Sequence, residues 1–230
     1  NRLMTLPFEN GNSILDGAIL TAFEQLSNTY TWTGASDNNY NINSNWYPPR
    51  ITPRPSDILI FNNGLQSEIT SVPNDFIRRL EISNGTKLSF NVLTTNNGIS
   101  SQYIIDHNQS TDSLQLLIEA GSSLKLNSTL GEKWIWKTGT GKNLISGKLE
   151  ITNQFDSTYA DFRNSNNLFP QGSVLNVNGR YRKAFLSSLN KTFMDGTCDI
   201  GGNISDGILL PSMQKLSHSK LKFSGNIRQN

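Results

Sequence analysis

The stretch LEISNGTKLSF at residues 80–90 has a close counterpart in LQLLIEAGSSLKL at residues 114–126. In each, an alternating pair of apolar residues precedes a Gly-Thr or Gly-Ser turn, and a second pair follows it. The pairs before the turn are Leu80/Ile82 and Leu116/Ile118, and those after it are Leu88/Phe90 and Leu124/Leu126. Alternation of this kind is typical of a strand with one buried face, and glycine suits the turn. The two stretches therefore predict a recurring strand–turn–strand unit.

Further alternating pairs continue the pattern towards the C-terminus. They are Leu149/Ile151, Leu175/Val177, Cys198/Ile200 and Leu221/Phe223, so that the successive intervals from Leu88 are 36, 25, 26, 23 and 23 residues. A short strand that returns at a nearly fixed period indicates a stacked repeat, in which each unit covers the apolar face of its neighbours. We expect a loop near residues 94–112 in the long first interval. We also expect one interior column, made of Leu88, Leu124, Leu149, Leu175 and Leu221.

The repeat favours an all-β solenoid of about six rungs, which we place at residues 76–230. The alternative is an antiparallel β-sandwich, whose strands usually recur at roughly 8–12 residues. Here the strongest period is about twice as long. The period therefore favours stacking over a sandwich.

Two segments precede the repeat. Within residues 1–29, the stretch SILDGAILTAFEQLS at 13–27 has its apolar residues at helical spacing. We predict a helix that caps the open end of the solenoid, or a linker helix from a preceding domain. Residues 30–75, here called the Trp/Pro segment, hold four prolines between positions 48 and 55. Prolines prevent a helix there, and we expect Trp32 and Trp46 to anchor the segment by packing.

Composition excludes several classes of function. The net charge is +2, and no run of Lys and Arg stands beside aromatic residues, so no nucleic-acid partner is expected. With Cys198 as the single cysteine, no internal disulfide can form. No apolar run approaches the 18 residues of a membrane span. The chain has no signal peptide and begins with Asn1, which we interpret as a mature or trimmed fragment.

No known catalytic pattern is present. His107 and His218 are far apart and lack neighbouring ligands, so no zinc site is predicted. Calcium-loop, nucleotide-binding and nucleophile motifs are missing as well. We therefore assign no catalytic residue, no metal ligand and no cofactor. Some β-helices cleave acidic polysaccharides, but the basic group Arg180, Arg182 and Lys183 lacks the clustered carboxylates that such chemistry uses.

Trp134 and Trp136, in the stretch KWIWK, are the candidate ligand-binding residues. On a strand they point to the same face. Exposed, they would form a platform for sugar rings. The alternative is that both belong to the core, as large aromatic residues usually do.

The Trp/Pro segment and the first repeats resemble a module of known surface proteins. The matching positions are Trp32, Gly34, Asn45, Trp46, Pro53, Asp57, Phe61, Val72-Pro73 and Leu80 to Phe90. They resemble a module at the start of many exported surface proteins of bacteria with type IX secretion, and the resemblance covers roughly residues 30–180. It implies export and a right-handed parallel β-helix. The helix at 13–27 is a departure from this pattern, and so is the absence of the C-terminal sorting domain of such cargo.

Two serines resemble acceptors of the O-glycosylation found in these bacteria, Ser113 in Asp-Ser-Leu and Ser157 in Asp-Ser-Thr. We predict a non-catalytic structural or display module of a secreted or cell-surface protein, adhesive in character. Its expected place is extracellular or on the outer cell surface. Its expected partners are other domains or subunits of a larger surface assembly, and glycans. The alternative is a β-helix module that binds carbohydrate or degrades polysaccharide.

Overall fold

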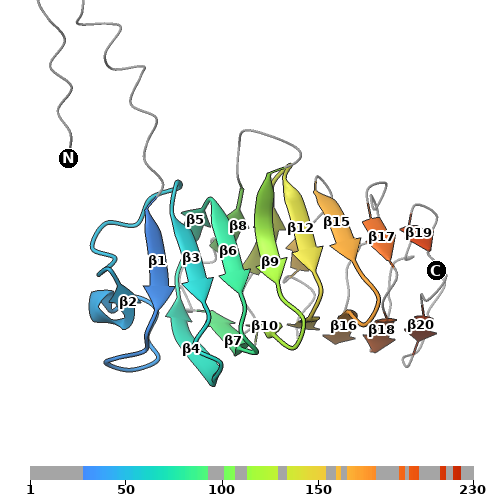
Figure 1. Cartoon of the computed structure of the whole chain (residues 1–230), viewed down its shortest axis with the longest axis horizontal. Coiled ribbons are helices and arrows are strands. Elements are labelled where there is room, and N and C mark those ends of the chain that lie inside the picture. Colours follow the sequence, from blue (N-terminus) through green and yellow to red (C-terminus); the bar gives the residue numbers. More distant parts are fainter. Residues whose placement is uncertain are drawn as a thin grey trace, which may run out of the picture.

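The computed structural model describes residues 28–92, 101–106, 113–128, 134–153, 159–161, 165–179, 192–194, 197–201, 213–215 and 220–223. Within them the chain is almost entirely β-strand, with a single short 3-10 turn, η1 (Asn43–Asn45). The strands lie side by side along the long axis of the molecule (Figure 1). The cap helix expected at residues 13–27 lies outside the described residues.

Three sheets run along the molecule. The nine-stranded sheet contains, in spatial order, β19 (Met213–Lys215), β17 (Thr192–Met194), β15 (Asn166–Phe169), β12 (Lys142–Ile145), β9 (Leu114–Ile118), β6 (Arg79–Ile82), β3 (Ile58–Phe61), β1 (Thr29–Trp32) and β2 (Trp46–Tyr47). The seven-stranded sheet contains β20 (Lys220–Phe223), β18 (Thr197–Gly201), β16 (Val174–Gly179), β13 (Lys148–Asn153), β10 (Ser123–Ser128), β7 (Lys87–Val92) and β4 (Gln66–Val72). The four-stranded sheet contains β14 (Tyr159–Asp161), β11 (Trp134–Thr138), β8 (Ser101–Ile105) and β5 (Asp75–Ile77).

The chain visits the sheets in turn. From β3 to β14, each circuit adds one strand to the nine-stranded, the seven-stranded and the four-stranded sheet, in that order. Strands of successive circuits pair in parallel, and β1 with β2 is the one antiparallel pair among the described strands. The fold is therefore all-β with parallel sheets. The antiparallel sandwich that the sequence left open is wrong.

The interior column predicted from the repeat is present. Leu88 pairs in register with Leu124, Leu124 with Leu149 and Leu149 with Leu175, and all four are at most 2% exposed. The register continues through Cys198 to Leu221. Phe90, Leu126 and Ile151 form a second column beside the first. The alternating pattern buries every second side chain, and the parallel register places equal positions above one another.

Glycine turns form several of the corners between the nine-stranded and seven-stranded sheets. Gly85 and Gly121 have φ of 71° and 80°, values that favour glycine over other residues. Thr86 and Ser122, which follow them, are buried, and their backbone N–H groups donate to the carbonyl oxygens of Ser83 and Glu119. The Gly-Thr and Gly-Ser signals of the sequence are therefore these corners.

Two details of the sequence prediction need correction. The expected loop at residues 94–112 contains strand β8, which pairs with β5 and β11 and so completes the four-stranded sheet. The described residues also form seven strands of the seven-stranded sheet, one for each circuit, whereas the sequence predicts about six rungs. The extra strand is β4, where Ser67 and Ile69 occupy the register positions of Leu88 and Phe90. Because serine breaks the apolar alternation, this strand was not recognised from the pattern.

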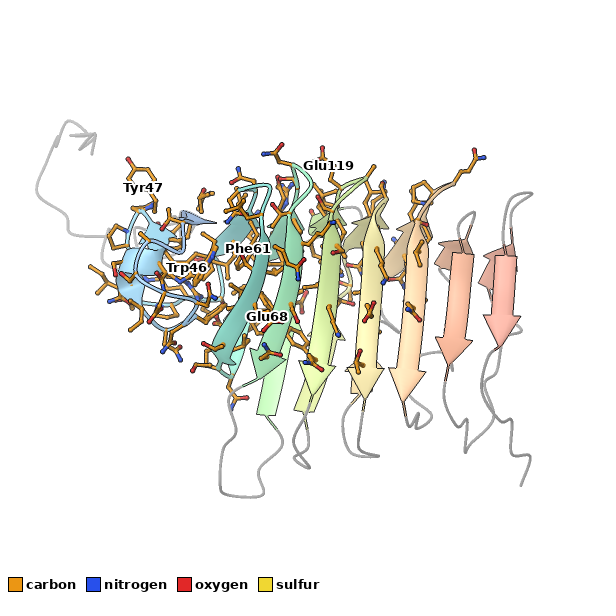
Figure 2. All side chains as sticks on the ribbon, turned by 90° about the horizontal axis from the view of Figure 1, so that it is seen from below. Trp46, Tyr47, Phe61, Glu68 and Glu119 are labelled. Atoms are coloured by element: carbon orange, nitrogen blue, oxygen red, sulfur yellow. The ribbon has the colours of Figure 1, made fainter. Side chains whose placement is uncertain are left out.

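The Trp/Pro segment closes the N-terminal end of the stack. Trp32 and Trp46 are each 2% exposed and their rings lie 5.0 Å apart, which confirms the packing role predicted for them. Trp46 and Phe61 lie inside this end, whereas Tyr47 projects away from it (Figure 2). Ring contacts continue inward from Phe61 to Phe90 and from Phe90 to Trp136. This aromatic cluster makes the Trp/Pro segment part of the same core as the repeats.

Candidate functional site

A buried charged network within the Trp/Pro segment connects the starts of β3 and β5, which belong to two different sheets. Arg50 is 3% exposed, and its Nε donates to Asp57 Oδ2 at 2.8 Å. Its Nη1 donates to Asp75 Oδ2 at 2.8 Å and its Nη2 to Asp75 Oδ1 at 3.3 Å. Asp57 lies directly before β3 of the nine-stranded sheet, and Asp75 begins β5 of the four-stranded sheet. One guanidinium group within the Trp/Pro segment therefore ties the start of β3 to the start of β5, and so joins two sheets.

Two tyrosines complete what we call the Arg50 network (Arg50, Asp57, Asp75, Tyr40 and Tyr103). The Tyr40 hydroxyl donates to Asp75 Oδ2 at 2.6 Å and lies 3.0 Å from the Tyr103 hydroxyl. It also accepts a hydrogen bond from Arg50 Nη1 at 3.1 Å. Both phenols are therefore engaged inside the protein.

The electrostatics of the network fix its protonation. Burial raises the pKa of Tyr40 well above its usual value, and the electrostatic interactions with Tyr103 and Asp75 raise it further. Burial likewise raises the pKa of Tyr103, with Asp75 adding to the effect. Burial alone would lower the pKa of Arg50, but Tyr40, Asp75 and Asp57 raise it overall. At neutral pH the tyrosines are thus neutral donors and Arg50 is a cation, which suits a fastening role better than proton transfer.

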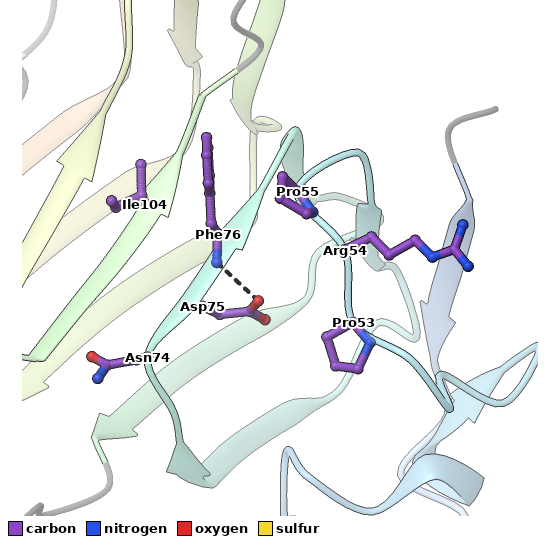
Figure 3. A pocket seen from close by; sticks show the side chains of 7 residues that line it. All are labelled: Pro53, Arg54, Pro55, Asn74, Asp75, Phe76 and Ile104. Carbon is purple, nitrogen blue, oxygen red and sulfur yellow. Dashed lines mark hydrogen bonds between the residues drawn. The ribbon is translucent and has the colours of Figure 1, made fainter. Parts of the chain in front are cut away.

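A surface hollow of about 520 Å³ lies beside this network. Its lining residues are Pro53, Arg54, Pro55, Asn74, Asp75, Phe76 and Ile104 (Figure 3). Pro53 and Pro55 face the residues of β5 across the hollow, and the Arg54 side chain extends away from the other six (Figure 3). Phe76 and Ile104 are half-buried neighbours on β5 and β8. The hollow therefore combines an apolar floor with a carboxylate edge.

The carboxylate edge also protects the outermost strand of the four-stranded sheet. β5 is the edge strand there, and the Phe76 N–H donates to Oδ1 of Asp75 at 2.9 Å. The other oxygen of Asp75 accepts from Tyr40 and Arg50. Asp75 is therefore fully engaged in holding the N-terminal end and in covering a strand edge.

The structure places Trp136 in the core. It is 3% exposed, and its ring lies 5.6 Å from Phe90 and 4.9 Å from Tyr103. An indole this deeply buried cannot stack on a sugar ring, so the ligand-binding interpretation fails for Trp136 and the core interpretation holds. Trp134 is the first residue of β11, at the position paired with Ser101. Its side chain lies outside the described part of the structure.

Of the other residues singled out from the sequence, Ser113 is the one that the structure describes. Ser113 is half-buried beside the start of β9, and its carbonyl oxygen accepts from the Lys142 N–H. Ser157, His107 and His218 lie outside the described residues, as do Arg180, Arg182 and Lys183. Among the described residues there is no group of three or more His, Cys, Asp and Glu side chains suited to a metal ion.

Sequence reasoning missed the Arg50 network. Asp57 enters the sequence analysis only through the family resemblance, and no sequence pattern assigns a role to Arg50 or Tyr40. The available signal was a lone arginine between prolines, in a segment with two tryptophans. That signal cannot identify partners 25 residues away and more.

Comparisons with known proteins identify no relative of this chain. No family model, curated protein or solved structure matches the chain. In the part of the chain that the structure describes, no helix has the length and hydrophobicity needed to cross a bilayer.

Proposed function

We propose that the chain is a non-catalytic structural or display module of a secreted or cell-surface bacterial protein, adhesive in character, and that its three sheets are the faces of a right-handed parallel β-helix. The observation that carries the proposal is the filled interior. Leu88, Leu124, Leu149 and Leu175 succeed one another in register, and all four are buried. A stack in which each circuit contacts only its neighbours makes a long, stiff spacer. Right-handedness follows the strong general preference of parallel crossover connections.

The chemistry of the described polar residues also supports a non-catalytic role. Glycoside hydrolysis requires two carboxyl groups on either side of a substrate. Asp57 and Asp75, which share Arg50, are both engaged with it in the interior. Engaged in this way, they hold the fold together and are poorly placed to act as an acid and base pair.

The test uses the purified chain and a panel of neutral and acidic polysaccharides, with and without calcium. The expected result is that polymer length, followed by size-exclusion chromatography, does not change. Reproducible depolymerisation that disappears when one carboxylate is changed to its amide would overturn the proposal. Export is tested separately, by labelling intact and permeabilised source cells with an antibody against the chain. Labelling only after permeabilisation would contradict a surface location.

The hollow beside Phe76 favours carbohydrate recognition as a second candidate function. A half-buried aromatic ring on the floor of a hollow of about 520 Å³ offers a stacking surface of sugar size. A Phe76→Ala variant should then lose binding to a neutral glycan that the parent chain retains. Equal binding by the two proteins would exclude this site.

A further inference from the structure

The outer face of the seven-stranded sheet carries a compact basic group. Lys87 on β7 and Lys148 on β13 occupy the same register position, with Ser123 of β10 between them. Lys125 on β10 occupies the next outward position, between Ser89 and Glu150. Strands in a sheet lie about 4.8 Å apart, so Lys87 and Lys148 start about 10 Å apart along the long axis. Three ammonium groups thus lie over three neighbouring strands.

The positive charge of this group is only partly neutralised. Glu150 pairs with Lys148 at 2.5 Å and with Lys125 at 3.5 Å. Partial burial alone would raise the pKa of Glu150, but Lys148 and Lys125 lower it, so this carboxylate is ionised at neutral pH. Lys87 is exposed and has no ion pair among the described residues. Glu68 on β4 lies on the same face, in register with Ser89, so three lysines here stand beside two carboxylates.

The lysines line a shallow groove rather than a flat surface. The groove has a volume of about 170 Å³, and Lys87, Lys125, Lys148 and Glu150 are among its lining residues. Side chains of Lys125 and Lys148 remain 41% and 43% exposed. A ligand can therefore reach both ammonium groups without displacing the core.

Side chains that can form hydrogen bonds lie on the same face, beside the lysines. Asn91 and Asn127 occupy adjacent register positions on β7 and β10, and Asn127 Nδ2 donates to Asn91 Oδ1 at 3.0 Å. Further along the sheet, the register places Lys220 of β20 in the row of Lys87 and Lys148. Charge and amide groups thus follow the long axis, across the strands. A linear polymer lying along that axis would meet lysines at intervals, with Ser123, Val174 and Thr197 at the positions between them.

We propose that this face across β7, β10 and β13 binds a linear acidic polysaccharide, with Lys87, Lys125 and Lys148 contacting its carboxylates. The groove is too shallow to enclose a small ligand, and its net positive charge attracts a polymer with repeated negative charges. This proposal goes beyond the structural role and does not depend on it, because the interior and the Arg50 network are not involved. It is also separate from the hollow beside Phe76, which lies against β5 and β8 of another sheet.

The test measures binding of polygalacturonate to the purified chain at low ionic strength by isothermal titration calorimetry. We expect Lys87→Gln/Lys148→Gln to bind roughly tenfold more weakly, since exposed charges each contribute a few-fold. The matched control is Lys137→Gln/Lys142→Gln, which removes two half-exposed lysines from the other two sheets. That control should bind like the parent chain. Circular dichroism and thermal melting establish that both variants are folded.

A second variant should change affinity in the opposite direction. Glu150→Gln removes the anion that competes for Lys125 and Lys148, and it should bind polygalacturonate a few-fold more tightly. Neutral dextran should not bind, and added salt should weaken polygalacturonate binding through screening. The proposal is overturned if polygalacturonate does not bind, if the two double variants lose affinity equally, or if Glu150→Gln has no effect. Equal affinity for double-stranded DNA would also overturn it, in favour of a general polyanion surface.

Discussion

Replacing Arg50 should destabilise the N-terminal end far more than replacing an arginine on the surface. In Arg50→Met, the apolar stem remains but three hydrogen bonds to two carboxylates and one to Tyr40 disappear. Asp57 is 0% exposed, and its Oδ1 has no hydrogen-bond partner among the described residues. In the variant, the Arg54 N–H is the remaining hydrogen-bond donor to this buried charge among the described residues.

The magnitude follows from the number of charged groups left without a partner. Removing one member of a buried ion pair typically costs 3–5 kcal/mol, because the remaining charge is buried without compensation. Arg50 serves two carboxylates whose side chains are 0% and 7% exposed, so we expect a loss at the upper end, about 5 kcal/mol. Arg50→Lys keeps the charge but loses the planar fork, and should fall between the parent chain and Arg50→Met.

The matched control is Arg79→Met. Arg79 pairs with Glu81 at 2.7 Å, but the two side chains are 29% and 22% exposed, so the pair should contribute only about 0–1 kcal/mol. Urea unfolding, followed by tryptophan fluorescence, measures the stability of both variants. Trp46 reports on the Arg50 site directly, because its ring lies 5.9 Å from the Arg50 guanidinium. Hydrogen exchange would locate the loss in β1, β3 and β5. If Arg50→Met and Arg79→Met differed by less than about 1 kcal/mol, the reasoning from buried charge would be refuted.

Three further predictions concern the core, the corners and alkaline pH. Leu124→Ala should cost about 2–5 kcal/mol in urea unfolding, whereas Leu65→Ala, at a side chain 63% exposed, should stay within about 0.5 kcal/mol; equal losses would contradict the interior column. Gly172→Ala, whose added Cβ meets open space but whose φ is 86°, should cost about 1–3 kcal/mol. Gly147→Ala should cost more, because its Cβ would overlap the carbonyl oxygens of Ser122 and Glu119; thermal melts of the two variants decide the order. Burial raises the pKa of Tyr40 and Tyr103 in the folded chain, so the stability that these two groups contribute should be fully present below the unfolded value near pH 10 and should be lost as the pH rises above it. An ultraviolet titration in which all six tyrosines ionise before the fold is lost would contradict this.

The stacking of the repeats could be predicted because it depends on local signals. Alternation in Leu88/Phe90 and Leu124/Leu126 specifies which face of each strand is buried, and the near-constant interval specifies which strands are neighbours. The register between these strands matches the alignment made from sequence. Where the alternation fails, as at Ser67 in β4, the prediction failed with it. Local pattern is therefore sufficient for the columns and insufficient for the first circuit.

The Arg50 network depends on distances that no local pattern contains. Tyr40, Arg50 and Asp57 are brought together by turns in a segment rich in proline, and Tyr103 arrives from a strand 63 residues beyond Tyr40. Each of these residues by itself would be expected on the surface or in a loop. Only the closure of the N-terminal end buries them. The basic groove has the same origin, because Lys87, Lys125 and Lys148 become neighbours through the stacking of β7, β10 and β13.

The N-terminal end shows why a stack of strands needs a segment of different composition. Each sheet has an outermost strand there, and an exposed edge promotes pairing with other chains. The nine-stranded sheet ends in the short antiparallel strand β2, and β4 of the seven-stranded sheet is covered by the hydrogen bonds of Thr70 with Asn38 and Tyr40. On β5, the Asp75 carboxylate accepts the Phe76 N–H. The repeat unit contains none of these features, because its strands are suited to pairing with the strands of a neighbouring repeat. The Trp/Pro segment contains all of these features. By joining Asp57 to Asp75, Arg50 also connects two of the three sheets at the point where stacking alone would leave their edges free.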